Sequence, residues 1–161
     1  MASKVRIVFK DNSLQVKNTI DDSLISWLNE ATKEIESKVK RESPVDTSKL
    51  KKSWNSKVDR KNKKGIIGSA SENAIWNEFG TGIHSSKGLG RKSPWYVSTD
   101  AIGSKSKKPS FRGKVQVVYG RNGKKYFKTD GKPAQHTLEQ SFVALKTKVK
   151  NQLKKKLRGM R

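Results

Sequence analysis

The stretch IDDSLISWLNEATKEIESKV, residues 20–39, decides the fold class of this chain. Its apolar residues recur at steps of three and four, which predicts an amphipathic helix with one buried stripe. Thr19 is the expected N-cap, and the acids that follow it are favoured in the first turn by the helix dipole. Pro44 ends the helix near residues 41–43. The expected buried stripe consists of Ile20, Leu24, Trp27, Leu28, Ala31, Ile35 and Val39.

A second long helix is predicted near the C-terminal end of the chain, from the same spacing of apolar residues. Residues 146–161 contain eight Lys or Arg side chains and no acid. Cations at a helix C-terminus are favoured by the dipole, which accounts for about one or two of them. The expected buried stripe of this helix consists of Leu138, Phe142, Leu145, Val149 and Leu153.

Strands are predicted between the two helices. Residues 55–60 and 65–70 are expected to form a hairpin around the polar loop 61–64. A second hairpin is predicted from residues 115–119 and 125–128, because the Asn-Gly pair in the intervening turn is a strong hairpin signal. The sequence pattern therefore predicts one folded domain with two long helices, antiparallel hairpins between them and extended polar loops.

Two shorter elements complete the predicted domain. Asp46 or Thr47 is expected to cap a short helix that carries Leu50 and Trp54. A small apolar cluster, expected as a short helix or turn, contains Ala74, Ile75, Trp76 and Phe79.

The first part of the chain, residues 1–18, is predicted to be a strand-like arm. Apolar and charged residues alternate over 4–10, as in a half-buried strand. A turn at 11–13 and a second strand at 14–16 are expected to follow. The single domain then spans 19–158, with polar loops at 80–93 and 103–114 that we expect a partner to order, and 159–161 form the tail end.

The chain is strongly basic. Its 161 residues contain 37 Lys and Arg against 14 Asp and Glu, a formal net charge of +23. Such a charge favours nucleic acid, an acidic protein surface or a membrane face as the partner. The absence of cysteine excludes disulfides, zinc–thiolate sites and thiol nucleophiles. The sequence contains no run of about 18 apolar residues, so no membrane span is predicted. Residues 1–11 lack the apolar core of a signal peptide.

Candidate catalytic and binding motifs fail on their spacing. The loop 80–93 invites comparison with a phosphate-binding loop, but Arg91 stands where that loop needs glycine before Lys-Ser. His84 and His136 show no spacing that predicts a metal pair. Glu36 begins an acid-x-Lys piece found in many nucleases, but it lies on a helix without strand context. We therefore predict no catalytic residue, no cofactor and no metal site.

Two acids need separate consideration. Asp46 is best interpreted as a helix N-cap, given its place before Thr47. Glu78 is expected to cap a helix, pair with a lysine or contact a neighbouring subunit, since no partner acid or base for catalysis is evident. Among the tryptophans, the core is expected to hold Trp27 and Trp54, and interfaces are expected to use Trp76 and Trp95.

Four local phrases occur in order along the chain. They are SPVDTSKL at 43–50, NAIWNEFGTG at 73–82, RKSPWY at 91–96 and TDGKPAQ at 129–135. The set resembles the tail-component family of long-tailed phages, also described as head–tail joining or tail-completion proteins, over about Ser43 to Leu145. The chain departs from the family pattern at Ser48, where Gly is usual, at Asn73, where Tyr is common, and at His136-Thr137, where Pro and an aromatic residue usually follow.

The resemblance implies the fold class α+β, a small single domain in which two long helices pack on an antiparallel sheet, with extended polar loops. It also implies a structural virion protein of the phage neck, without enzymatic activity. We expect it to form a ring, a hexamer, that completes the tail and joins it to the DNA-filled head. Its expected partners are further copies of itself, the adjacent head-side connector, tail terminator or tail tube, and genomic double-stranded DNA in the lumen, with no membrane. We expect it in the virion after assembly in the host cytoplasm. The particular neck layer stays open, as does whether the positive charge faces DNA or protein.

Two sets of contact residues follow from the resemblance and the charge. The phrase at 78–82 is expected to be a fixed turn that launches an inter-subunit loop, with glycines supplying positive φ. Inter-subunit or partner contacts are expected at Trp76, Glu78, Phe79, Gly80, Thr81, Gly82 and Trp95. Contacts to DNA or an acidic partner are expected at Lys61, Lys63, Lys64, Lys154, Lys155, Lys156 and Arg158.

A basic, non-enzymatic nucleic-acid-binding protein is the alternative function. The charge alone suggests it, but the sequence contains no helix-turn-helix, aromatic stacking motif or zinc spacing. A metal-dependent nuclease is a more remote alternative, in which Glu78 and Asp46 would be the first acids to test.

Overall fold

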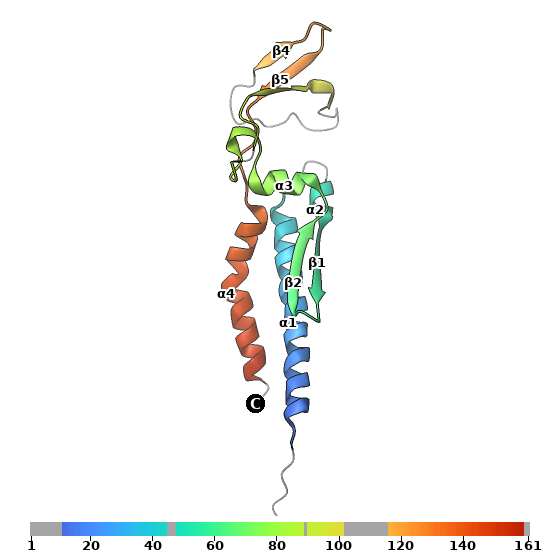
Figure 1. Cartoon of the computed structure of the whole chain (residues 1–161), viewed down its shortest axis with the longest axis vertical. Coiled ribbons are helices and arrows are strands. Elements are labelled where there is room, and N and C mark those ends of the chain that lie inside the picture. The colour runs from blue at the N-terminus through green and yellow to red at the C-terminus, as the bar shows by residue number, and fades with distance from the viewer. Residues whose placement is uncertain (1–10, 45–47, 89, 102–115, 160–161) are drawn as a thin grey trace, which may run out of the picture.

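The computed structural model describes residues 11–44, 48–88, 90–101 and 116–159, and shows an elongated molecule (Figure 1). Two long helices, α1 (Ser13–Glu42) and α4 (Thr137–Arg158), lie side by side. A hairpin of β1 (Trp54–Asp59) and β2 (Lys64–Ser69) also packs against α1. The short helices α2 (Lys49–Ser53) and α3 (Glu72–Phe79) lie at one end of this base.

A second, three-stranded sheet lies beyond α3 (Figure 1). Its strand order is β3-β5-β4, and both pairings are antiparallel. The α+β class with two long helices is therefore confirmed, and the antiparallel strands divide between two small sheets. The elements of this end are β3 (Trp95–Ser98), β4 (Val117–Tyr119), β5 (Lys125–Thr129) and two short 3-10 helices at Gly82–His84 and Thr99–Ala101.

Helix α1 begins earlier than the sequence pattern predicts. The first helical residue is Ser13, whose backbone N–H donates to the Asp11 carboxylate at 2.8 Å. The N-cap predicted at Thr19 is wrong, because Thr19 lies inside the helix and donates its hydroxyl to the Gln15 carbonyl at 2.9 Å. The strand predicted at 14–16 is also wrong, since no Gly or Pro separates these residues from the helix that follows. The predicted C-terminus is confirmed, because α1 ends at Glu42.

The core forms where α1 meets the hairpin, α3 and α4. It contains Ile35 and Val39 of α1, Trp54 of β1 and Ala74 of α3, all buried. The Trp54 indole N–H donates to the buried Ser43 hydroxyl at 2.9 Å, so this aromatic ring enters the core with its polar group satisfied. Trp54 begins a strand, so its predicted place in the short helix is wrong, whereas its place in the core is confirmed.

The predicted stripe on α1 is only partly buried. Ala31, Ile35 and Val39 are buried, but Ile20 is 44% exposed. Trp27 is half-buried and joins the two helices by donating its indole N–H to the Val149 carbonyl at 2.9 Å.

The first predicted hairpin is confirmed. Its register runs from Trp54 opposite Ser69 to Asp59 opposite Lys64. The turn is held by Asp59, whose carboxylate accepts the Asn62 backbone N–H at 3.0 Å. A Cβ on Gly65 would lie 2.3 Å from the Thr32 methyl carbon, so this glycine lets β2 approach α1 closely.

Helix α4 faces α1 with polar as well as apolar residues. Ser141 is fully buried and donates its hydroxyl to Glu42 at 2.9 Å, while Leu138 and Leu145 pack on the core. The predicted stripe is wrong at Phe142, which is 49% exposed, because Ser141 occupies the inward position of that turn. The other four predicted positions of the stripe are half-buried.

The second predicted hairpin is confirmed within the described residues, as β4 and β5 around Gly120–Gly123. Strand β3, which pairs with β5, was not predicted as a strand. Predictions for residues 1–10, for Asp46 and Thr47, and for the loop 103–114 lie outside the described residues. Within the described part, no helix has the length and apolar character needed to cross a membrane.

Candidate functional site

Two segments far apart in the sequence meet where α3 approaches α4. We call the region formed by residues 75–84 and 130–139 the α3–α4 junction. Its backbone bonds run from Thr81 N–H to the Lys132 carbonyl at 2.8 Å and from Gln135 N–H to the Asn77 carbonyl at 2.8 Å. The second and fourth of the quoted phrases therefore pack against each other, and they join the helical base to the three-stranded sheet (Figure 1).

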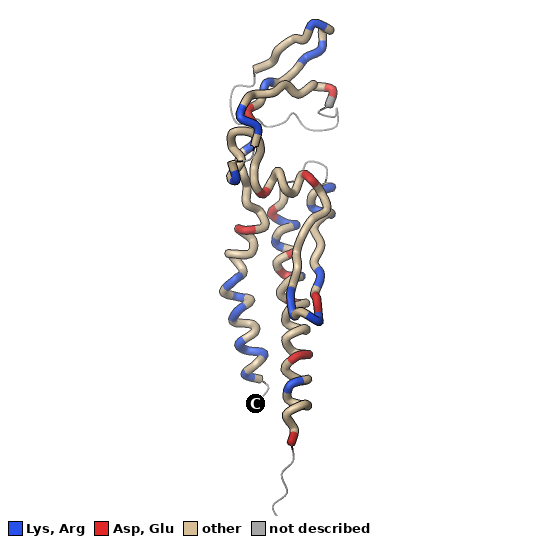
Figure 2. Tube along the Cα trace, viewed as in Figure 1, with Lys and Arg blue, Asp and Glu red and all other residues tan. Residues whose placement is uncertain are grey.

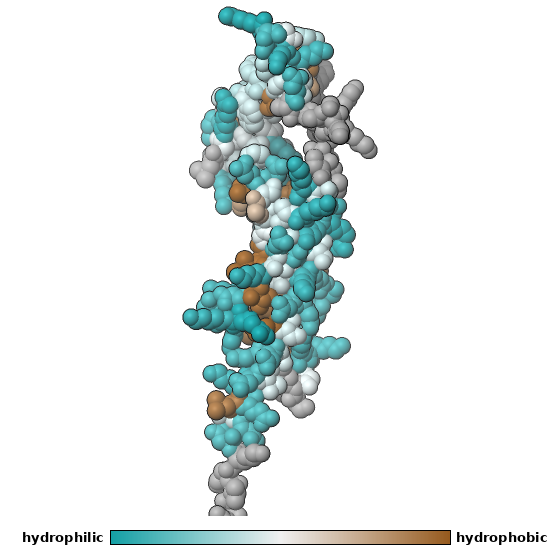
Figure 3. Space-filling model, turned by 90° about the vertical axis from the view of Figure 1, so that its right-hand side faces the viewer, coloured by the Kyte–Doolittle hydropathy of each residue, from teal (hydrophilic) through white to brown (hydrophobic). Residues whose placement is uncertain are grey.

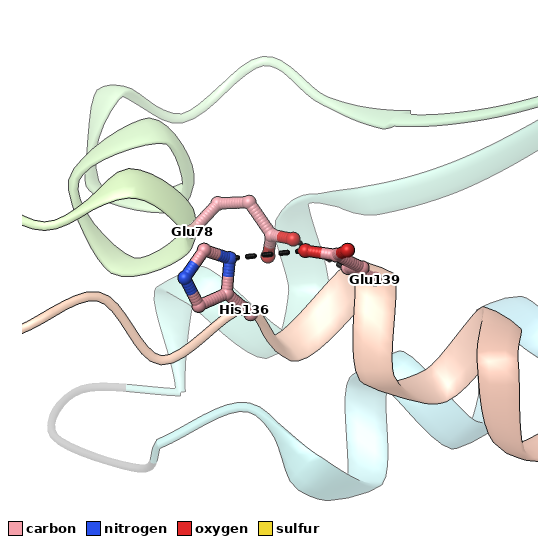
Figure 4. Close-up of side chains that lie close together, drawn as sticks. All are labelled: Glu78, His136 and Glu139. Carbon is pink, nitrogen blue, oxygen red and sulfur yellow. Dashed lines mark hydrogen bonds and ion pairs between the residues drawn. The ribbon is translucent and has the colours of Figure 1, made fainter. Parts of the chain in front are cut away.

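Glu78 fastens the start of α4 at this junction (Figure 4). Its two carboxylate oxygens accept the backbone N–H groups of Leu138 at 2.8 Å and Glu139 at 3.0 Å. These are the second and third residues of α4, the N–H groups that an N-cap side chain usually satisfies. The N-cap residue itself, His136, makes no such bond. Glu78 is only 8% exposed, so of its predicted roles the structure shows helix capping.

The amide of Asn77 adds a second link beside Glu78. Its nitrogen donates to the Thr137 hydroxyl at 2.8 Å, and its oxygen accepts from the Lys132 ammonium at 3.2 Å. Burial lowers the pKa of Lys132 from its ordinary value. Sequence reasoning missed Asn77, because its partners come about sixty residues later in the chain.

Glu78, His136 and Glu139 also bring three potential metal ligands within 4.8 Å of one another (Figure 4). His136 Nδ1 lies 3.1 Å from a Glu139 carboxylate oxygen, without hydrogen-bond geometry, and His84 is not part of the group. Both oxygens of Glu78 already accept N–H groups, and the helix N-terminus carries positive partial charge. This electrostatic environment favours the capping carboxylate over a bound cation.

Two glycines fix the turn between α3 and the sheet. Gly80 and Gly82 have φ of +73° and +62°, which confirms the predicted positive φ. A Cβ on Gly82 would lie 2.0 Å from the Asp130 carbonyl oxygen and 2.9 Å from the Trp95 ring. The third phrase therefore reaches the same junction through Trp95, and no larger residue fits at Gly82.

The junction exposes three large apolar side chains. Ile75 is 59% exposed, Trp76 50% and Ile83 53%. Phe79 is half-buried and lies beneath the Lys87 ammonium, 3.9 Å from its ring centroid. Of the predicted contact residues, Trp76 thus faces outward, whereas Glu78, Gly80 and Gly82 are buried by their own chain and hold the turn in place.

Further apolar side chains lie along the rest of the molecule. Figure 3 shows one face that is mostly hydrophilic, with hydrophobic side chains gathered in a few patches along the long axis. Beside the three residues of the junction, the large hydrophobic residues exposed in the described part of the chain are Leu14, Val16, Ile20, Ile66, Tyr96, Val117, Tyr119, Phe142, Val143 and Leu157.

The predicted basic contact residues fall into two groups. Lys63 is paired with Asp21 at 2.5 Å and Lys156 with Glu30 at 2.7 Å, so both cations are neutralised within the chain. The exposed members without an ion pair to a described acid are Lys61, Lys64, Lys154, Lys155 and Arg158. Figure 2 shows Lys and Arg repeated along α4.

These features define an elongated, basic α+β protein with apolar side chains presented on rigid backbone, a surface suited to contacts with other macromolecules. Residues 9–80 match the family model described as "Bacteriophage HK97-gp10, putative tail-component". The match confirms the resemblance to a phage tail-component family, over a stretch that reaches from before α1 to the end of α3. It includes the first phrase and most of the second, while the third and fourth lie beyond it. No curated protein and no solved structure matches the chain.

Proposed function

We propose that this chain is a structural virion protein of the neck of a long-tailed phage. Copies form a ring, a hexamer, that completes the tail and joins it to the DNA-filled head, after assembly in the host cytoplasm. The head-side connector and the tail terminator or tail tube are its neighbours, and it has no catalytic role. The family match at residues 9–80 supports a structural tail component.

The exposed apolar surface of the α3–α4 junction carries this proposal. Three large apolar side chains, Ile75, Trp76 and Ile83, face outward from backbone that Glu78 and Gly82 hold in place. Tryptophan on a preorganised surface is a frequent anchor of protein interfaces. A surface of this kind that meets a different surface of the next copy generates a ring when the rotation between successive copies closes.

The test is complementation of a phage that carries an early stop codon in this gene. A plasmid supplies the unchanged protein or the I75S/W76S variant, with I66S as the control because Ile66 is 54% exposed on the hairpin. We expect the unchanged protein and I66S to restore infectious particles, and I75S/W76S to lower their yield at least about 100-fold, which is roughly 3 kcal/mol of lost contact. Full rescue by I75S/W76S would overturn this assignment of the surface.

The second candidate is a basic nucleic-acid-binding protein that acts outside the virion, which the net charge of +23 favours. The same phage distinguishes the two functions. Loss of a free nucleic-acid-binding protein leaves head–tail joining intact, whereas loss of a neck protein leaves heads and tails apart.

A further inference from the structure

Helix α4 has one face that no described element covers. Leu138, Leu145 and Val149 turn toward α1. At 100° per residue, cations at steps of four turn by about 40° per step, so they run from the side of the helix beside this stripe to its opposite face. We call these residues the α4 basic row, and all four are exposed: Lys146, Lys150, Lys154 and Arg158.

The row is not neutralised within the described part of the chain. Two acids of α1 form ion pairs with lysines of α4 outside the row. Glu34 pairs with Lys148, and Glu30 pairs with Lys156. No member of the row forms an ion pair with a described acid. Glu139 is the one acid within the sequence of α4.

A second copy of this chain is a poor partner for the row. Each copy carries a formal charge of +23, so contact between copies leaves the row repelled unless acids are concentrated opposite it. In the described part, Glu36 and Glu42 also have partners, in Lys40 and Lys38. The complement of the row is therefore a polyanion.

The spacing of the row along α4 allows each cation to reach a separate phosphate of a nucleic-acid backbone. Steps of four residues place successive cations about 6 Å apart, and the whole row spans about 18 Å. Duplex DNA presents one phosphate per strand about every 3.4 Å along its axis. Long Lys and Arg side chains along a straight helix can thus each reach a different phosphate.

We propose that the α4 basic row binds the phosphate backbone of double-stranded DNA. The choice of DNA over an acidic protein rests on the proposed function, since a neck ring encloses the path of the genome. The proposal excludes Lys63 and Lys156, whose charges are paired within the chain. It predicts binding without sequence preference, because phosphate contacts carry no direct sequence information.

The experiment measures binding of the full chain to a fluorescent DNA duplex by anisotropy across a salt series. The row variant K146Q/K150Q/K154Q/R158Q is compared with a control, K49Q/K52Q/K57Q/R60Q, that removes the same charge from exposed positions near the hairpin. The slope of log affinity against log salt should fall by about 3 to 4 for the row variant, at roughly 0.9 per phosphate contact. The ratio of the DNA affinity of the unchanged protein to that of this variant should then fall about 100-fold between about 50 and about 200 mM salt.

Two results would overturn the proposal. One is a row variant with the slope of the unchanged protein, and the other is an equal loss of slope in the control, which would mean that net charge alone binds DNA. Polyglutamate serves as the competitor, and displacement of DNA at equal charge concentration would assign the row to an acidic protein instead. Circular dichroism checks that α4 is intact, as expected because Gln is a good helix former. Head–tail joining is scored separately in the complementation assay, so failure of this proposal is distinguishable from failure of the proposed function.

Discussion

Glu78 links α3 to α4 by capping a helix that begins about sixty residues after it. The carboxylate is buried and accepts two backbone N–H groups that otherwise have no partner at the start of α4. Charged acceptors make stronger hydrogen bonds than neutral ones, and a buried N–H without a partner costs about 1–3 kcal/mol. One side chain of α3 therefore helps to fix where α4 begins.

We expect E78Q to lower the free energy of unfolding by about 1–3 kcal/mol, because the amide offers one good acceptor where the carboxylate offers two. The matched control is E72Q, an exposed residue of the same helix, which should cost less than about 1 kcal/mol. Urea denaturation followed by fluorescence measures both. Equal stability of E78Q and the unchanged protein would contradict the capping role.

Gly82 makes a prediction that separates a steric clash from backbone strain. G82A places a Cβ 2.0 Å from the Asp130 carbonyl oxygen at φ +62°, whereas G88A has φ +67° and nothing within 4 Å. Both variants should lose about 1–2 kcal/mol from the left-handed backbone, and G82A should lose at least about 2 kcal/mol more. Similar unfolding midpoints in urea would show that the junction relaxes around the added methyl group.

The positive φ of the turn glycines was predictable from the sequence. The capping role of Glu78 was predicted only as one of three options. A Gly-Thr-Gly phrase needs little context, since glycine is the residue that adopts positive φ without strain. The partners of Glu78 and Asn77 lie in α4 and depend on how the chain returns to α3, which no local pattern encodes.

At the scale of elements, the contact between α1 and α4 depends on charge. Hydrogen bonds from Lys148 and Gln152 hold the pKa of Glu34 below its ordinary value near 4.5. Lys156 lowers the pKa of Glu30 in the same direction, through an ion pair whose Glu30 side chain is 62% exposed. The Lys148 side chain is 61% exposed, so water screens both ion pairs, and Glu34 gains a further hydrogen bond from Gln152.

A lowered pKa in the folded state stabilises the fold above about pH 4.5, and this stability is lost as the pH falls through the folded-state value. We therefore expect the melting temperature to fall as the pH drops from about 6 to about 3. The variant E30Q/E34Q should show a weaker dependence on pH in this range, because it no longer releases these two pairs on protonation. Parallel curves for the variant and the unchanged protein would contradict the role of the two pairs.

Elements with a complete local pattern were predicted well. The first hairpin has alternating strands and a polar turn, and α1 ends where Pro44 requires it. The start of α1 and strand β3 were not predicted. Leu14–Val16 is too short to distinguish strand from helix by periodicity, and β3 becomes a strand only through pairing with β5, about thirty residues later.

At the scale of the whole molecule, the structure explains why so many apolar residues of this chain are exposed. The long helices and the hairpin bury a narrow core, while the three-stranded sheet stands apart at one end (Figure 1). In the part of the chain that the structure describes, 13 large hydrophobic residues are exposed and several lysines have no ion pair with a described acid, which suits an assembly in which neighbours cover the surface. The sequence predicted the basic character, but not which residues face outward, because exposure depends on the packing of distant elements.

Electron microscopy of the uncomplemented stop-codon lysate tests the central claim most directly. If the chain is a neck protein, the lysate contains DNA-filled heads beside unattached tails, and few joined particles. Intact virions in normal numbers would contradict the account and favour the basic nucleic-acid-binding protein.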